Sequence, residues 1–320
     1  PNIFVTLHPI MMILSPEIHL STPSAATIGC FDGVHRGHQM LVQLMVRQAR
    51  QRGLKPIAVT FDRLPRQLFD PNFHPQLLST LEEKTACLKE LGVEEVIILP
   101  FTHQLAALSA EAFMREVLRD QLSVELLVTG YDHRFGHDRS EGFDDYVRYG
   151  QRLGIDVVRG DVAMMDNQMA VSSTMIRQLL AEEGRVEMMP DVLTRQYTLS
   201  GHVVSGEHIG HELGFPTANL EPDSKEKLIP ASGVYAVWAM VDGCRMPAMM
   251  NIGTRPTFAG KQQTLEVHIL KEVGNLYGHS MTVAFVSRLR AEQRFDTCEA
   301  LIAQLQRDKQ ASEELLLNDK

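Results

Sequence analysis

The residues GCFDGVHRGH at positions 29–38 decide the fold of the first half of this chain, because they follow a short apolar strand predicted at residues 25–28. Their three glycines let the backbone approach an anionic group closely, since glycine has no Cβ and tolerates conformations that other residues avoid. A helix that begins near Gly37 would point its free N–H groups and the positive end of its dipole to the same place. The stretch therefore indicates a strand, a phosphate-binding turn and a helix.

The first half continues as an alternation of strands and helices up to about residue 160. Such an alternation predicts an α/β fold with a doubly wound parallel sheet, whose ligands bind at the carboxyl ends of the strands, where residues 29–38 lie. The expected strands are 25–28, 56–61, 95–99, 126–129 and 155–158, and the expected helices are 37–51, 82–91, one opened by Ser109, and 142–153.

The pattern changes after Gly184, where short β-branched segments are separated by glycine or proline turns. This texture predicts a small antiparallel β-barrel, closed by a C-terminal helix from about Thr297. The expected strands are 198–204, 233–241, 245–251, 264–270 and 280–285. We expect two domains, residues 1–186 and 187–320, with the boundary between Gly184 and Tyr197.

Composition limits the classes of function. The chain has 320 residues, more than one core usually serves, with 44% hydrophobic and 22% charged residues. Its net charge of −9 argues against a protein that binds nucleic acid, although a local basic cluster could still hold a small anion. The four cysteines are scattered and form no C-x-x-C pair, which favours a reducing cytoplasm over a zinc site. The apolar residues 3–14 are too few to cross a bilayer and are expected either to form a first strand or to lie partly upstream of a true start at Met11 or Met12.

His35 and His38 lie three residues apart at the predicted helix start, so both imidazoles could donate hydrogen bonds to phosphate oxygens. There they would stabilise the charge that develops when an α-phosphorus is attacked. An isolated H-x-x-H is more often a polar turn, or sometimes a metal site, but the glycine-rich lead-in after a strand is more restrictive.

Residues 172–177, SSTMIR, could form a second contact for a polyphosphate. Hydroxyl groups at a helix start and the Arg177 guanidinium one turn later suit the β- and γ-phosphates of ATP. The ordinary alternative is a simple helix N-cap.

A second motif, GFPTANL, occupies residues 214–220. Thr217 and Asn219 are two apart on an extended segment, so a hydroxyl and an amide oxygen would face the same way and suit a hard cation with its bound phosphates. The segment from Gly206 to Gly210 would be a flap over those phosphates. An ordinary turn is the alternative.

Glu266 is a candidate base, because strand alternation puts it on one face with His268 and puts Leu265, Val267 and Ile269 on the other. Such a strand often shows its charges to solvent instead.

Taken together, the chain resembles the bacterial bifunctional riboflavin kinase/FMN adenylyltransferases, the FAD synthetases. The matching stretches run in the family's order over nearly the whole chain: residues 27–38, 130–136, 172–177, 201–206, 213–220, 233–235, 251–258, 266–268 and 289–290.

For the first domain, the resemblance implies an HxGH-type nucleotidyltransferase, in which the FMN phosphate attacks the α-phosphorus of ATP to give FAD and pyrophosphate with Mg²⁺. It implies catalytic roles for His35, His38 and Arg177. The implied ATP and phosphate contacts are Gly29, Phe31, Asp32, Gly33, Asp132, Arg134, Ser172, Ser173 and Thr174.

For the second domain, the resemblance implies ATP-dependent phosphorylation of riboflavin to FMN. Glu266 would take the proton of the riboflavin 5′-hydroxyl, and Thr217 and Asn219 would bind Mg²⁺ with ATP, under a flap that includes Gly206 and Gly210. Arg290 and Phe295 match the family's flavin-side region, although Phe295 could simply pack against the last helix.

The resemblance leaves two departures and two other hypotheses. Arg63-Leu64-Pro65 stands where the family usually has Pro-His-Pro, and His133 replaces a common Phe. These changes favour, as a first alternative, a riboflavin kinase whose adenylyltransferase half is inactive or uses another acceptor. A second alternative is a flavin-binding regulatory protein without turnover.

The expected partners are the small molecules riboflavin, FMN and ATP, with no nucleic acid, membrane or obligate protein partner, and the expected location is cytoplasmic.

Overall fold

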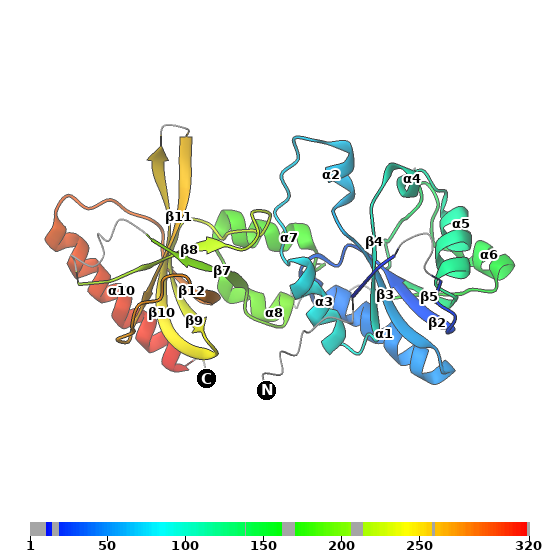
Figure 1. The fold of residues 1–320 in the computed structure, drawn as a ribbon, viewed down its shortest axis with the longest axis horizontal. Coiled ribbons are helices and arrows are strands. Elements are labelled where there is room, and N and C mark those ends of the chain that lie inside the picture. Colours follow the sequence, from blue (N-terminus) through cyan, green and yellow to red (C-terminus); the bar gives the residue numbers. More distant parts are fainter. Residues whose placement is uncertain are drawn as a thin grey trace. The chain divides into compact units, whose positions relative to one another are not determined.

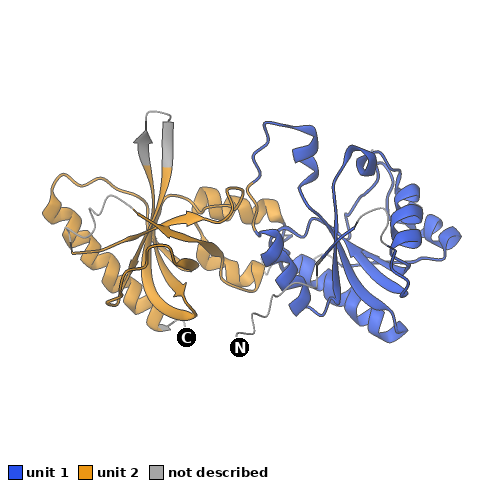
Figure 2. Ribbon diagram, in the orientation of Figure 1, with its two compact units in different colours: residues 1–75, 79–172 blue, residues 76–78, 173–320 orange. Residues whose placement is uncertain are grey.

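The computed structural model describes residues 11–14, 19–137, 139–161, 170–205, 214–257 and 260–318. The chain divides into two compact units (Figure 2). The first comprises Pro1–Pro75 with Ser79–Ser172, and the second Gln76–Leu78 with Ser173–Lys320. Within the described residues, no helix is both long enough and apolar enough to cross a bilayer.

The first unit is built on a six-stranded sheet in which every neighbouring pair is parallel (Figure 1). The strand order is β1-β4-β3-β2-β5-β6. The bounds are β1 Met11–Ile13, β2 Ser24–Ile28, β3 Lys55–Phe61, β4 Glu95–Leu99, β5 Val124–Thr129 and β6 Asp156–Arg159. All five residues of β2 are buried, as expected for a central strand of a parallel sheet. The predicted doubly wound sheet is confirmed.

Helices cover both faces of this sheet, because apolar side chains project from its central strands in both directions. One core includes Val42, Met45 and Leu88 from helices α1 and α3, and the other includes Phe113 and Tyr146 from α5 and α6. The helical segments are α1 Arg36–Arg52, α2 Pro65–Phe69, α3 Leu81–Glu90, α4 His103–Ala106, α5 Ala110–Phe113, η2 Met114–Gln121 and α6 Phe143–Leu153, with the single turn η1 at Asp32–Val34.

The strand order reverses between β2 and β5, since the chain proceeds from β2 to β3 on one side and later places β5 on the other. In doubly wound sheets ligands bind at such a switch point, outside the carboxyl ends of the strands. The loop with residues 29–38 follows β2, and the loop with residues 130–136 follows β5. The fold therefore puts both loops at the expected binding edge.

The second unit contains a closed antiparallel barrel with the strand order β10-β11-β8-β7-β12-β9 (Figure 1). Its strands are β7 Thr198–Val204, β8 Ala218–Pro222, β9 Gly233–Val241, β10 Cys244–Thr257, β11 Gly260–Ile269 and β12 Ser280–Arg290. Helix α10, Cys298–Asn318, packs against β9, β10 and β12. The predicted barrel and C-terminal helix are confirmed, and the extended segment predicted around Thr217 leads into the strand β8.

Four short helical segments precede the barrel and pack with it: α7 Ser173–Gln178, η3 Leu179–Glu183, η4 Val186–Met188 and α8 Met189–Leu193. The backbone N–H of Ala231 donates to the carbonyl of Leu180 at 2.8 Å, and Arg288 donates to the carbonyl of Glu183 at 2.9 Å. The compact units thus part at Ser172, while the predicted functional boundary after residue 186 stays a prediction.

Candidate active sites

The loop after β2 has an unusual backbone that three residues create. Phe31, Gly33 and Val34 have φ values of 47°, 80° and 41°, in the left-handed region. Two hydrogen bonds to Ser79 hold this shape. The Gly33 N–H donates to the Ser79 hydroxyl at 2.9 Å, and the Ser79 N–H donates to the buried Asp32 carboxylate at 3.2 Å. Phe31, Asp32 and Gly33, predicted as phosphate contacts, therefore shape the turn from inside.

His35 and His38 meet at the start of α1. His35 is the N-cap residue, and the His38 N–H donates to its Nδ1 at 3.4 Å. The two rings are stacked with 3.6 Å between centroids, and the Phe31 ring contacts His38 edge-on at 5.3 Å. The sequence-predicted pair is thus one unit at a helix N-terminus.

Burial makes both imidazoles neutral near pH 7. It lowers the pKa of His35 to about 4 and, with the nearby His35, lowers the pKa of His38 well below its ordinary value. The Nδ1 of His38 is buried and has no hydrogen-bond partner within the described part of the chain. A buried nitrogen without a hydrogen-bond partner, beside a helix N-terminus, suits a ligand that carries hydrogen-bond acceptors or donors.

Lys84 lies behind this loop and was not singled out from the sequence. Its ammonium group donates to the Cys30 carbonyl and to the Thr60 hydroxyl, both at 3.0 Å, and burial lowers its pKa. Lys84 and Leu88 are the buried residues of α3, so a lysine on an apolar helical face was the available signal. The arrangement places a buried lysine behind the loop of residues 29–38, with its ammonium group bonded to the protein.

The loop after β5 contributes His133, beside the predicted Asp132 and Arg134. Asp132 and Arg134 are exposed, and Arg134 donates to the Arg139 carbonyl at 3.2 Å. Burial lowers the pKa of His133 to about 4, and its Nε2 is buried without a partner among the described residues. The departure from the family's Phe therefore adds a third buried imidazole, and repulsion between protonated His133 and His38 helps to lower the pKa of His38.

The predicted segment 172–177 spans the division between the two units. Ser172 ends the first unit, whereas Ser173, Thr174 and Arg177 belong to α7 in the second. The Arg177 guanidinium donates to the Gln76 carbonyl at 2.8 Å within that second unit. The predicted catalytic role of Arg177 stays a prediction.

A row of side chains crosses five strands of the barrel in register. Asn219 pairs with Glu266, Glu266 with Asn251, Asn251 with Val234, and Val234 with Arg290. Directly opposite residues of antiparallel strands project from the same face. The backbone register thus places the candidate base between two asparagine side chains.

This face forms a cavity of about 340 Å³ with α10. It brings together four sequence-predicted residues, Thr217, Glu266, Arg290 and Phe295, with Leu301 and Leu305 of α10 on the far wall. Asn219 is not among the lining residues, although its backbone is paired with Glu266. Thr217, Asn219 and Glu266 present oxygen donors of the kind that Mg²⁺ prefers.

Asn251 and His268 also line this cavity and were not predicted as site residues. The Nδ1 of His268 lies 2.8 Å from the Pro216 carbonyl, and its ring is 5.3 Å from that of Phe215. Burial lowers the pKa of His268. Because a neutral imidazole must donate to a carbonyl, Nδ1 carries the proton. The signal for His268 was its position on the Glu266 face.

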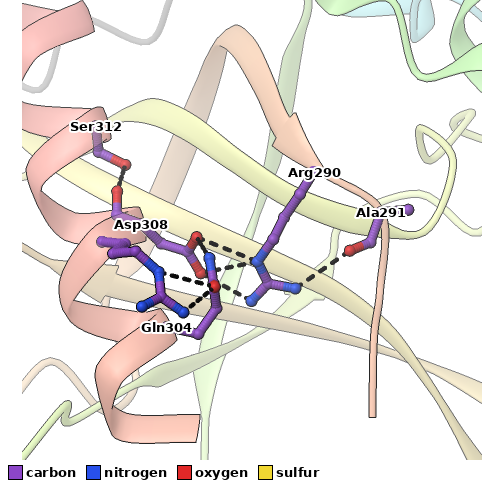
Figure 3. Close-up of polar contacts among 6 residues, drawn as sticks. Arg290, Ala291, Gln304, Asp308 and Ser312 are labelled. Carbon is purple, nitrogen blue, oxygen red and sulfur yellow. Dashed lines mark hydrogen bonds and ion pairs between the residues drawn. The ribbon is translucent and has the colours of Figure 1, made fainter. Parts of the chain in front are cut away.

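The Arg290 guanidinium is held by Asp308 of α10 (Figure 3). Its Nε donates to both carboxylate oxygens at 3.1 and 3.0 Å, its Nη2 donates to Oδ2 at 2.7 Å, and its Nη1 donates to the Ala291 carbonyl at 3.1 Å. The Phe295 ring centroid lies 5.8 Å from the Arg290 Cζ. Arg290 therefore reaches the cavity as half of a buried ion pair.

A second cavity of about 910 Å³ adjoins Thr217 on its other side. Its walls include Gly214, Pro216, Lys271 and Tyr277. Gly206 and Gly210, predicted as a flap, lie outside the described residues.

Comparisons with known proteins agree on both halves of the chain. A family model described as FAD synthetase matches residues 17–175, and one described as riboflavin kinase matches residues 193–316. The bifunctional riboflavin kinase/FMN adenylyltransferase of Escherichia coli (strain K12) is 37% identical over 90% of this chain and 91% of its own length. The protein of that name from Pseudomonas fluorescens is 38% identical, with coverages of 91% and 92%.

A solved structure titled macrolide-efflux protein from Streptococcus pneumoniae is also similar. It has a TM-score of 0.88 and 29% sequence identity, and the match covers 95% of this chain and 99% of that one. The folds of the two units are thus ones that a solved structure also has.

Proposed function

The chain belongs to the bifunctional riboflavin kinase/FMN adenylyltransferase family, and we propose that each of the two domains expected from the sequence, residues 1–186 and 187–320, carries one active centre. It phosphorylates riboflavin to FMN with ATP and then transfers an adenylyl group from ATP to FMN, which gives FAD and pyrophosphate. The positions of the two family matches support this division, with a functional boundary near residue 186.

For adenylyl transfer, we propose that the FMN phosphate attacks the α-phosphorus of ATP at the β2–β5 edge. His35 and His38 donate N–H groups to the phosphate oxygens, and the N-terminus of α1 stabilises the negative charge that grows there. The observation that carries this assignment is the stacked, buried histidine pair at 3.6 Å on a helix N-terminus. Lys84 adds positive charge behind the loop.

Other side chains complete this first centre in the proposal. Gly29 lets the backbone approach the nucleotide, Asp132 and Arg134 contact it from the β5 loop, and Arg177 with the hydroxyls of 172–174 holds the triphosphate. These residues position and neutralise, so the reaction needs no covalent enzyme intermediate.

For phosphoryl transfer, we propose that the Glu266 carboxylate accepts the proton of the riboflavin 5′-hydroxyl as that oxygen attacks the γ-phosphorus of ATP. The 340 Å³ cavity with Arg290 and Phe295 would hold riboflavin, and the 910 Å³ cavity would hold ATP, because Thr217 lies at the wall of both. Thr217 and Asn219 would hold Mg²⁺, which neutralises charge on the transferred phosphate. The flap with Gly206 and Gly210 would close over the phosphates.

We propose small-molecule substrates as the only partners that the two centres require, with ATP supplied together with Mg²⁺. A cytoplasmic location is supported by the four cysteines, Cys30, Cys87, Cys244 and Cys298, none of which forms a disulfide among the described residues.

A chromatographic time course with riboflavin, ATP and Mg²⁺ tests the proposal. We expect FMN to rise first and then to give way to FAD. Accumulation of FMN without FAD would favour the alternative in which the histidine-bearing unit is inactive. Tight flavin binding without any consumption of ATP would favour the regulatory protein.

A further inference from the structure

The Arg290–Asp308 ion pair lies at the wall of the proposed riboflavin cavity, and the burial of two charged groups there needs an explanation. The Arg290 and Asp308 side chains are only 18% and 4% exposed. A buried pair is weak evidence for stability, because taking both charges out of water offsets most of their attraction. An apolar pair of side chains would pack equally well at these positions. The charged pair therefore indicates a role other than packing.

The geometry separates the two partners by their access to the cavity. Arg290 lines the cavity together with Glu266 and Phe295, whereas Asp308 is not among the lining residues. Asp308 approaches from behind, on α10, and contacts the guanidinium through both carboxylate oxygens (Figure 3). A bidentate contact of this kind fixes the plane of a guanidinium as well as its position.

Asp308 is itself held in place. The Gln304 amide donates to its Oδ1 at 2.8 Å, and the Ser312 hydroxyl donates to its backbone carbonyl at 2.8 Å (Figure 3). All three residues belong to α10, which packs across β9, β10 and β12. The orientation of Arg290, at the end of β12, is therefore set by a different element from the one that carries it.

We propose that Asp308 is a positioning residue for the flavin: it holds the Arg290 guanidinium in one plane beside Phe295, so that the two form a fixed surface for the isoalloxazine ring. Planar guanidinium and aromatic faces both stack on flat rings. The carboxylate also neutralises Arg290, so an uncharged ring meets no unpaired cation. The inference rests on the proposed riboflavin site and adds a residue outside the cavity.

The test is steady-state kinetics of both activities in Asp308→Asn, which keeps the side chain's shape and removes its charge. Adenylyl transfer from ATP to supplied FMN uses the other centre and serves as an internal standard for protein concentration, while the melting temperature reports whether the second unit is folded. We expect the riboflavin KM of the kinase to rise about tenfold to a hundredfold, because a charged hydrogen bond that orients the binding surface is lost, with an unchanged KM for ATP.

The matched control is Asp242→Asn in the same unit. Asp242 is an exposed carboxylate that lies 2.8 Å from the Nδ1 of His279, outside the cavity lining. We expect its riboflavin KM to equal that of the parent protein. A lower melting temperature with unchanged riboflavin KM in Asp308→Asn would mean that the pair only stabilises the fold, and would overturn the proposal.

A double variant covers the case in which Asp308→Asn does not fold, since removal of one partner leaves a buried unpaired charge. Replacement of both residues, Arg290→Met with Asp308→Leu, keeps an apolar contact of similar volume. We expect a folded protein with a raised riboflavin KM, and a parental KM would overturn the proposal. Glu266→Gln, assayed in parallel, separates the proposed riboflavin site from the proposed role of Asp308. Retained FMN formation in Glu266→Gln would refute the site, whereas only the riboflavin KM reports on Asp308.

Discussion

The two units build their sites from opposite parts of a sheet. In the first unit, His35 and His133 lie on loops at the carboxyl ends of β2 and β5, next to a helix N-terminus. In the second unit, Asn219, Asn251 and Glu266 lie within strands, side by side in the ladder. A parallel sheet covered on both faces can expose chemistry only at its edge, whereas a barrel wall can carry it on a face.

The two sites also offer opposite chemistry. The first presents the imidazoles and the helix N-terminus as donors, and Lys84 lies behind them. The second presents oxygen acceptors from Thr217, Asn219 and Glu266. Donors suit direct binding of phosphate, while oxygens suit a hard cation and the removal of a proton. The same nucleotide can thus be used in two ways by one chain.

The largest effect that we expect is from Glu266→Gln. Loss of the proposed base should lower FMN formation by about 10²–10⁴-fold, while FAD formation from supplied FMN continues. Chromatography of both reactions measures this. Glu221→Gln serves as the control, because Glu221 is an exposed carboxylate on the neighbouring strand β8. This variant should keep both activities. Loss of both activities in folded Glu266→Gln protein would contradict separate sites.

The reverse result is expected for His38→Ala. Loss of one preorganised donor should lower FAD formation by about 10²–10³-fold, with FMN formation unchanged. The same chromatographic assay reads both products, with His19→Ala, an exposed histidine, as the control. Equal FAD formation in the two variants would remove His38 from the proposed mechanism.

The buried histidines predict a pH dependence of stability in the first unit. The folded-state pKa of His35 is about 4 and its ordinary value is 6.5, so the unfolded chain binds more protons between these values. The contribution of neutral His35 to the free energy of unfolding is fully present above pH 6.5. It is lost as the pH falls toward 4, by about 3 kcal/mol in all.

Urea unfolding at different pH values measures this loss, and hydrogen exchange of the α1 amides measures it within the first unit. His35→Gln should flatten the decline between pH 6.5 and 4, whereas His19→Gln should leave it unchanged. An equal slope in His35→Gln would show that His35 does not cause the dependence.

The smallest effect is expected from Ser79→Ala, which removes the acceptor of the Gly33 N–H. Loss of this buried hydrogen bond should reduce the free energy of unfolding by about 1–3 kcal/mol and loosen the turn. FAD formation should fall moderately while FMN formation stays at the parental rate. Thermal unfolding and the two-product assay test this, and a matching fall in FMN formation would contradict a local effect.

Much of the fold could be predicted because the periodicities are strong. The strands expected at 25–28, 56–61 and 95–99 appear within one residue of their expected bounds. The helix opened by Ser109 is different: α5 ends at Phe113 and continues as the wider π-helical turn η2. Local capping signals mark where a helix begins but not which hydrogen-bond spacing its packing later selects.

The alternation around Glu266 was informative for the same reason. Leu265, Val267 and Ile269 are 5%, 1% and 6% exposed, as a buried face requires. His268 on the opposite face is also buried, at 7%, because Phe215 and the loop at Pro216 cover it. A period of two residues distinguishes the faces of a strand but not what covers each face.

The sequence by itself determined the two architectures, the histidine pair at the start of α1 and the family, because these depend on neighbours within a few residues and on motifs in order. Only the tertiary structure decided that Lys84 lies behind the β2 loop, that the Nε2 of His133 is buried, and that Asp308 holds Arg290. The contacts of Lys84 and Arg290 join residues 18 to 54 positions apart, and the desolvation of these groups depends on the packing of whole elements, which no local pattern of residues records.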